Sequence, residues 1–177
     1  MSRYVRPSGS VDTFFFTARA ARRGDDLFTS HIDALRSAMR HTRASYPFVI
    51  EEIVVLPDVI HTLWTLQDRD GDHARRWRML KNLFSRNVNV LTDAGPQHPR
   101  TVEKGLWHRR IWEHRIRGAD DLAAHRHLIF CAPVQAGLVD CPKAWPHSSI
   151  HRAAARGTYT PDPSTTVSNP PPPDKVA

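Results

Sequence analysis

The stretch that decides the fold is 48-FVIEEIVVLPDVIHTLWTL-66. Two runs rich in β-branched and aromatic residues, 48–56 and 59–66, lie on either side of Pro57-Asp58, a dipeptide typical of turns. Runs of this kind separated by turn residues predict a pair of antiparallel strands. Both runs are largely apolar.

Further strands and helices are expected on both sides of this pair. The expected elements are a strand over 11–18, a helix from Thr29 or Ser30 to about residue 43, a helix from Asp72 to about residue 87, a strand within 106–116, and a helix from Asp120 or Asp121 to Pro133. The order strand–helix–strand–strand–helix–strand–helix predicts an α+β fold. We expect a mainly antiparallel sheet with helices on one face.

The chain has 177 residues, which is enough for one domain with a tail. Six of its 14 prolines fall within 161–177, a segment with almost no apolar side chains to bury. We therefore expect a folded domain over 3–157 and a disordered tail with polyproline II character over 158–177. A ligand for a proline-recognition domain is the alternative to an inert tail.

The net charge limits the classes of partner. Lys and Arg number 25 against 18 Asp and Glu, which gives +7 and a pI near 10.1, so a polyanion is the first partner to consider. No apolar stretch approaches the roughly 18–20 residues that span a bilayer, and no signal-peptide pattern follows Met1. Two cysteines are too few for a disulfide framework, which favours a reducing compartment. Together, these features lead us to expect a cytoplasmic protein that does not enter membranes.

Basic side chains gather along the expected 72–87 helix and within 104–117, where two tryptophans are interspersed. Arginine contacts phosphates, and indole rings stack on unpaired bases, so this mixture favours a nucleic-acid interface. A solvated helix face beside core tryptophans is the alternative. The candidate binding residues are Arg75, Arg78, Lys81, Arg86, Trp107, Arg109, Arg110 and Arg115.

His61 is a candidate metal ligand in the middle of an expected strand. Alternation places Val59, His61 and Leu63 on one face of that strand. A pair of strand ligands would need a second histidine two residues away, but that position is Val59, which cannot coordinate an ion. A hydrogen-bonded structural histidine is the alternative.

Several segments in a fixed order resemble a known family. They are 13-TFFFT-17, 31-HIDALR-36, 53-IVVLPD-58 with 60-IH-61 and 63-LWTL-66, 76-RWR-78 with Lys81 and 84-FSR-86, 105-GLWHRRIWEH-114 continuing to Asp121, and 133-PV-134 with 137-GLV-139 and 145-WPHSS-149. Together, over residues 3–157, they resemble the REP-associated tyrosine transposases, a branch of the single-tyrosine HUH transposase superfamily. The resemblance implies a ferredoxin-like antiparallel sheet of about five strands with helices packed on it.

The resemblance also implies a chemistry and a partner. In the family, a tyrosine hydroxyl attacks a DNA phosphodiester and forms a 5′-phosphotyrosine link. A Mg²⁺ or Mn²⁺ ion, held by two histidines and a polar side chain, polarises the phosphate. Members act on single strands and recognise hairpins formed by repetitive extragenic palindromes, so the implied partner is hairpin or single-stranded DNA.

This sequence departs from the family at the residues that carry the chemistry. The motif Pro-Asp-His-hydrophobic-His reads 57-PDVIH-61, so Val59 replaces one metal ligand and only His61 remains. The motif Tyr-Ile-His-x-Asn-Pro reads 128-LIFCAP-133, which puts Leu128 at the nucleophile position and Ala132 at the third ligand position. We therefore expect no intact catalytic residue and no productively bound metal ion.

Three interpretations remain open from the sequence. The first is a protein that binds hairpin or single-stranded DNA, at the bacterial nucleoid, without cleaving it. The second is an active transposase with a substitute nucleophile such as His127 or Cys131, although the sequence suggests no general base for the cysteine. The third is a decaying gene product with a residual fold. A monomer and a homodimer are both compatible with the sequence.

Overall fold

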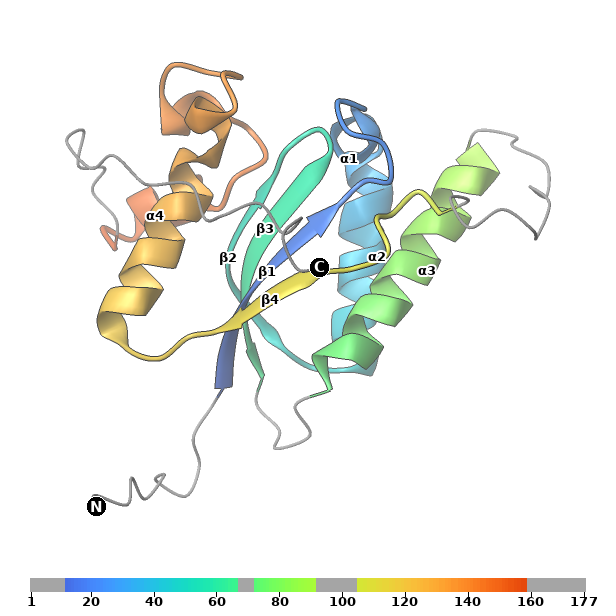
Figure 1. Ribbon diagram of the computed structural model, residues 1–177, viewed down its shortest axis with the longest axis horizontal. Helices are drawn as coiled ribbons and strands as arrows, with labels where there is room; N and C mark the ends of the chain where they lie inside the picture. The colour runs from blue at the N-terminus through green and yellow to red at the C-terminus, as the bar shows by residue number, and fades with distance from the viewer. Residues whose placement is uncertain (1–11, 67–71, 92–104, 159–177) are drawn as a thin grey trace, which may run out of the picture.

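The computed structural model describes residues 12–66, 72–91 and 105–158. The predicted disordered tail lies outside the described residues, except for Thr158. The elements, labelled as in Figure 1, are β1 (Asp12–Arg19), α1 (Leu27–Ser30), α2 (Ile32–Ser45), β2 (Val49–Val55), β3 (Val59–Leu66), α3 (His73–Leu91), β4 (Trp112–Arg115), α4 (Ala119–Gln135), a 3-10 turn η1 (Pro142–Ala144) and α5 (Ile150–Ala155).

The described residues contain four strands, where the family resemblance implied about five, and they form one antiparallel sheet in the order β2-β3-β1-β4. Two strand–helix–strand units in the order βαββαβ give the ferredoxin-like arrangement. A short extension covers the outer edge of β2, where Ser148 forms an antiparallel bridge with Val54 and the Val55 N–H donates to the His147 carbonyl at 2.8 Å. The predicted α+β class and the strand pair around residues 57–58 are confirmed.

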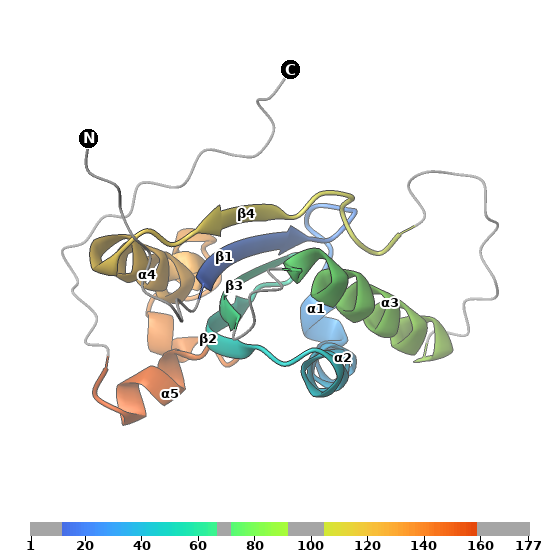
Figure 2. The same ribbon diagram turned by 90° about the horizontal axis from the view of Figure 1, so that it is seen from below.

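Helices cover both faces of the sheet, so the prediction of helices on one face is wrong. In Figure 2 the sheet separates α2 and α3 on one side from α4 and α5 on the other. The reason lies in the strands: Phe16 and Trp64 pack toward α2 and α3, whereas Phe15 and Leu63 pack into a second apolar cluster with α4 and α5. Strands that are apolar on both faces need cover on both faces.

The helix boundaries follow identifiable side chains. Asp72 caps α3 as predicted, because its Oδ1 accepts the Arg75 N–H at 2.8 Å. Pro133 was expected to end α4, but it lies inside the last turn. The helix ends through Gly137 at φ 67°, where the Gly137 and Leu138 N–H groups donate back to Val134 and Pro133 at 2.9 Å.

A buried glutamate joins α4 and α5 to the sheet. Glu52 on β2 is 6% exposed, and its Oε2 accepts a hydrogen bond from Ser149 Oγ at 2.7 Å. Arg126 on α4 and Arg152 on α5 place guanidinium nitrogens 3.7 and 3.6 Å from its carboxylate oxygens. A buried carboxylate held in this way orders the surrounding elements because an unpaired one would be costly.

We expect Glu52→Gln to lower the free energy of unfolding by about 2 kcal/mol, since it leaves both arginines without a counter-charge. The two arginines are partly exposed, which keeps the loss below that of a fully buried pair. Urea unfolding followed by circular dichroism measures this loss. The neighbouring Glu51→Gln is the control, and equal losses in both variants would contradict the assignment.

Candidate nucleic-acid interface and catalytic positions

His61 lies on β3, on the sheet face that packs against α4, as its alternation with Ile60 predicts. Its Nδ1 is 2.9 Å from the Thr17 hydroxyl, and its ring stacks on Phe15 with 5.8 Å between centroids. Burial, followed by the positive charge of Arg19, lowers the pKa of His61 from 6.5 to about 3. The imidazole is therefore neutral at physiological pH and hydrogen-bonded to a strand neighbour.

The three positions at which this sequence departs from the family motif come together in space. Val59 on β3 and Leu128 and Ala132 on α4 all belong to the apolar cluster between the sheet and α4, and each is less than 9% exposed. None of the three side chains carries an oxygen or nitrogen. Mg²⁺ and Mn²⁺ need several oxygen or nitrogen ligands at nearly fixed geometry. The residues around His61 therefore do not fit the metal ion that the family resemblance implies.

Two side chains that were considered as substitute nucleophiles lie side by side on α4. Cys131 Sγ is 3.4 Å from His127 Nε2, one helical turn away. The expectation that Cys131 has no neighbouring base was therefore wrong, because His127 can serve as one. The i, i+4 spacing of the two residues could have indicated this contact from the sequence, because residues four apart are neighbours on a helix surface.

The predicted binding residues divide into exposed and buried ones. Arg75, Arg78, Arg86, Arg109, Arg110 and Arg115 are exposed. Two of the exposed arginines already have partners, because Arg75 lies over the Tyr46 ring at 4.5 Å and Arg115 pairs with Asp12. Arg78, Arg86, Arg109 and Arg110 present charge on the outer side of α3 and on the segment that enters β4.

Trp107 and Lys81 make contacts within the protein that stabilise its fold. Trp107 is 8% exposed and packs between Phe28 and Phe84, with ring centroids 4.8 and 5.2 Å away. The structure therefore supports the alternative of a core tryptophan. Lys81 donates to the His108 carbonyl at 2.9 Å and lies over the Trp107 ring, and burial lowers its pKa. These contacts fix the 105–111 segment alongside α3 (Figure 1), which positions Arg109 and Arg110.

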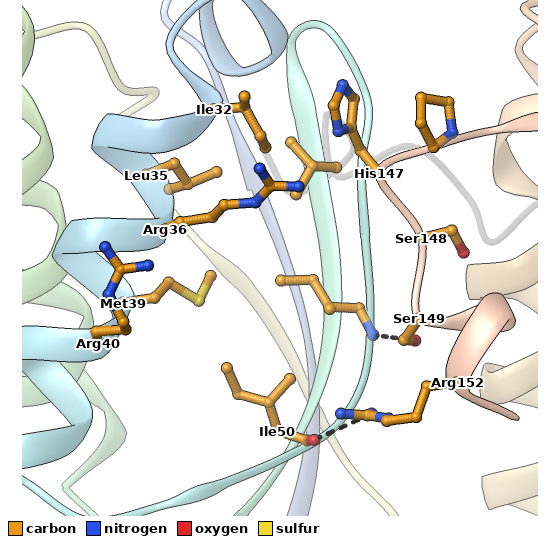
Figure 3. Close-up of a pocket in the computed structure, with 13 residues that line it drawn as sticks. Ile32, Leu35, Arg36, Met39, Arg40, Ile50, His147, Ser148, Ser149 and Arg152 are labelled. Atoms are coloured by element: carbon orange, nitrogen blue, oxygen red, sulfur yellow. Dashed lines mark hydrogen bonds between the residues drawn. The ribbon is translucent and has the colours of Figure 1, made fainter. Parts of the chain in front are cut away.

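A cavity of about 350 Å³, which the sequence did not predict, lies between α2 and the 146–152 segment (Figure 3). Its walls include Leu35 and Met39, and Arg36, Arg40 and Arg152 also line it. It sits beside the outer edge of β2, at the opposite end of the sheet from β4. The cavity depends on the bridge between Val54 and Ser148, a contact between distant segments that no local pattern reveals.

The chain is similar to known proteins over most of its length. No family profile matches the chain. It is 37% identical over 92% of its length to a protein of Haemophilus influenzae named as a REP-associated tyrosine transposase, and it covers 93% of that protein. A REP-associated tyrosine transposase of Escherichia coli K12 is 35% identical over 90% of this chain and 88% of its own.

Solved structures agree with these relatives. The structure of a REP-associated tyrosine transposase bound to a REP hairpin matches with a TM-score of 0.78 and 34% identity, and it covers 96% of this chain and 94% of that one. A protein of Deinococcus radiodurans described as a transposase matches with a TM-score of 0.51 at 14% identity, over 77% of this chain and 95% of that one, which shows a shared fold.

Among the described residues, none of the helices has the length and apolar character needed to cross a membrane. The two curated relatives exceed one third identity over nearly their full lengths, and the hairpin-bound structure has the same fold. The chain belongs to the family of REP-associated tyrosine transposases.

Proposed function

We propose that this chain binds hairpin-forming single-stranded DNA of the REP type and does not cleave it. The observation that carries the proposal is the burial of Val59, Leu128 and Ala132 in one apolar cluster. The family resemblance assigns two metal ligands and the nucleophile to these positions. Here they form packing contacts between β3 and α4.

Binding is supported by the charge that remains on the surface. A transposase of the same family and fold has been solved with a REP hairpin, and this chain carries exposed arginines on α3 and the 109–117 segment. Arginine contacts to phosphates position a protein on nucleic acid without reading its sequence. The proposed binding surface consists of Arg78, Arg86, Arg109 and Arg110, and Lys81 and Trp107 support it from below.

We expect no cleavage because the apolar cluster contains neither the family nucleophile nor two of the family metal ligands. A covalent intermediate needs a nucleophilic side chain, and the position of the family tyrosine is an apolar Leu128. A phosphate without a metal ion loses the electrostatic stabilisation of its transition state. We propose that residues 3–157 form the binding unit in the cytoplasm, with the 158–177 tail outside it.

A second candidate function rests on the contact between Cys131 and His127. A thiol 3.4 Å from an imidazole nitrogen can lose its proton to that base and attack phosphorus, displacing a 3′-hydroxyl and leaving DNA on the sulfur. The proposal of binding alone is preferred because the residues beside His61 do not fit a metal ion. A DNA adduct that is absent from Cys131→Ala would favour the second function.

The double substitution Arg109→Ala with Arg110→Ala tests the proposed binding surface. We expect the affinity for a REP-type hairpin at 100 mM salt to fall about 10- to 30-fold, because two phosphate contacts are lost. Fluorescence anisotropy with a labelled hairpin measures the change. The slope of log K against log salt should become shallower by about 1.5.

The matched control removes the same charge from the other side of the molecule. Lys143→Ala with Arg156→Ala changes two exposed cations on η1 and next to α5. We expect this variant to bind within about threefold of the parent chain, since it alters only the net charge. Equal weakening by the two double variants would contradict the assignment of the surface.

A further inference from the structure

Three metal-ligating side chains converge where β4 passes into α4. His114 lies on β4, and Asp121 and His125 lie one turn apart near the start of α4. One ligand atom from each lies within 4.8 Å of the other two. The Asp121 carboxylate connects them: Oδ2 is 2.9 Å from His114 Nε2, and Oδ1 is 2.9 Å from His125 Nδ1.

The surroundings hold these side chains in place. The His114 and His125 rings stack with 4.7 Å between centroids, Phe15 packs on His125, and Trp112 packs on His114. Each of the three polar side chains is less than a third exposed. A hydrophobic shell of this kind controls the access of solvent to a metal site.

The Asp121 carboxylate is held in position by its neighbours. Its Oδ2 accepts a hydrogen bond from the Arg117 N–H at 2.8 Å, and its two oxygens face the ring nitrogens of His114 and His125. These contacts fix the orientation of the carboxylate before any ion arrives, which reduces the entropy lost on binding.

We propose that His114, Asp121 and His125 form a divalent transition-metal site of the zinc class, separate from the family site at His61. Two imidazole nitrogens and one carboxylate oxygen are a ligand set that Zn²⁺ accepts, with a fourth position left for water. The Phe15 ring lies between this group and His61, since it packs on both His125 and His61. The proposal does not depend on DNA binding.

The distances are close to those that zinc requires. Ligand atoms about 2.1 Å from a tetrahedral ion lie about 3.4 Å from each other. The 2.9 Å separations involve two different oxygens of Asp121, whereas a single carboxylate oxygen and the two ring nitrogens lie within 4.8 Å of one another. The longest of these separations therefore needs to close by at most about 1.4 Å. His114 Nε2 and His125 Nδ1 both lie within hydrogen-bond distance of oxygen atoms of Asp121. To coordinate the ion, each of these nitrogens must give up the proton of that hydrogen bond, either to the other nitrogen of its ring or to solvent.

A bound ion would connect the last strand to the helix that carries the altered catalytic positions. His114 belongs to β4, whereas Leu128 lies one turn beyond His125 on α4. The ion would cross-link these two elements across the 116–118 connection. Because it binds the folded chain and not the unfolded one, it raises the thermal midpoint of unfolding as its concentration increases.

The test uses the purified full chain, treated with chelator and then titrated with Zn²⁺ in a calorimeter. We expect one equivalent to bind, with at least about a 100-fold loss of affinity in His125→Gln and in Asp121→Asn, because each removes a ligand. His61→Gln and His151→Gln are the controls and should bind as the parent does. Unchanged binding in both ligand variants, or its loss in His61→Gln, overturns the proposal.

X-ray absorption of the parent chain with one equivalent of Zn²⁺ guards against variants that fail to fold. The expected first shell contains nitrogen and oxygen only, with the scattering of two imidazole rings. A sulfur atom in the first shell would assign the ion to Cys131 or Cys141 and overturn the proposal. A titration without saturable binding up to 1 mM Zn²⁺ (an order-of-magnitude ceiling for a specific site) overturns it as well.

Discussion

Restoring the three replaced side chains together, as Val59→His, Leu128→Tyr and Ala132→Asn, is expected to produce cleavage of a REP-type hairpin. The removal of a nucleophile has cost on the order of 10⁶ in rate in a hydrolase, so the gain over the unaltered chain should be at least about 10³-fold. The reason is geometric: the three positions already lie in one apolar cluster, and His61 lies two residues from Val59 on the same face of β3. A 5′-labelled hairpin with Mn²⁺, analysed on a denaturing gel, measures it.

A matched control separates chemistry from folding. The same triple variant with Leu128→Phe instead of tyrosine has the same ring and no hydroxyl, so it should fold alike and form no covalent adduct. Either ring adds volume to a site that is 7% exposed, which costs about 1–3 kcal/mol of stability. If the tyrosine variant is folded by circular dichroism, binds the hairpin and still yields no product, these positions are not the former active site.

The affinity of the unaltered chain for a hairpin is expected to fall steeply with salt. A protein that contacts six phosphates with arginine or lysine loses about 10³-fold in affinity between 50 and 200 mM salt, because bound counterions are released. The net charge of +7 and the exposed arginines on α3 and the 109–117 segment lead us to expect a loss of this size. Anisotropy titrations at four salt concentrations give the slope.

The hairpin preference is measured in the same titrations with an unstructured strand of equal length. We expect the hairpin to bind more tightly at every salt concentration, with a similar slope for both strands, since phosphate contacts carry the salt dependence. A slope close to zero would show that the arginines do not contact phosphates. Equal affinity for the two strands would reduce the proposed function to nonspecific binding.

The sheet could be predicted because its strands are locally distinct. The 48–66 pair, the strand at Phe14–Phe16 and the helix after Asp72 each carry a periodicity or a cap that acts over a few residues. We did not predict that helices cover both faces of the sheet, although the three consecutive phenylalanines require apolar contacts on both sides of β1. A helix on only one face would have left Phe15 exposed.

The sequence predicts those features of the candidate site that depend on which residue stands at a position, but not those that depend on packing. The motif departures at Val59, Leu128 and Ala132 follow from the sequence, whereas their common burial depends on how α4 packs on the sheet. Trp107 shows the limit: its basic neighbours suggested a surface ring, but contacts with Phe28 and Phe84 from distant elements bury it. The clustering of His114 with Asp121 and His125 likewise depends on the turn between β4 and α4.

The central claim is that the chain binds a REP-type hairpin and leaves it intact. One incubation of the unaltered chain with labelled hairpin and Mn²⁺, divided between a native and a denaturing gel, tests both halves of it. The account predicts a shifted complex on the native gel and a single full-length strand on the denaturing gel. A shortened strand, or label that migrates with the protein after denaturation, would contradict it.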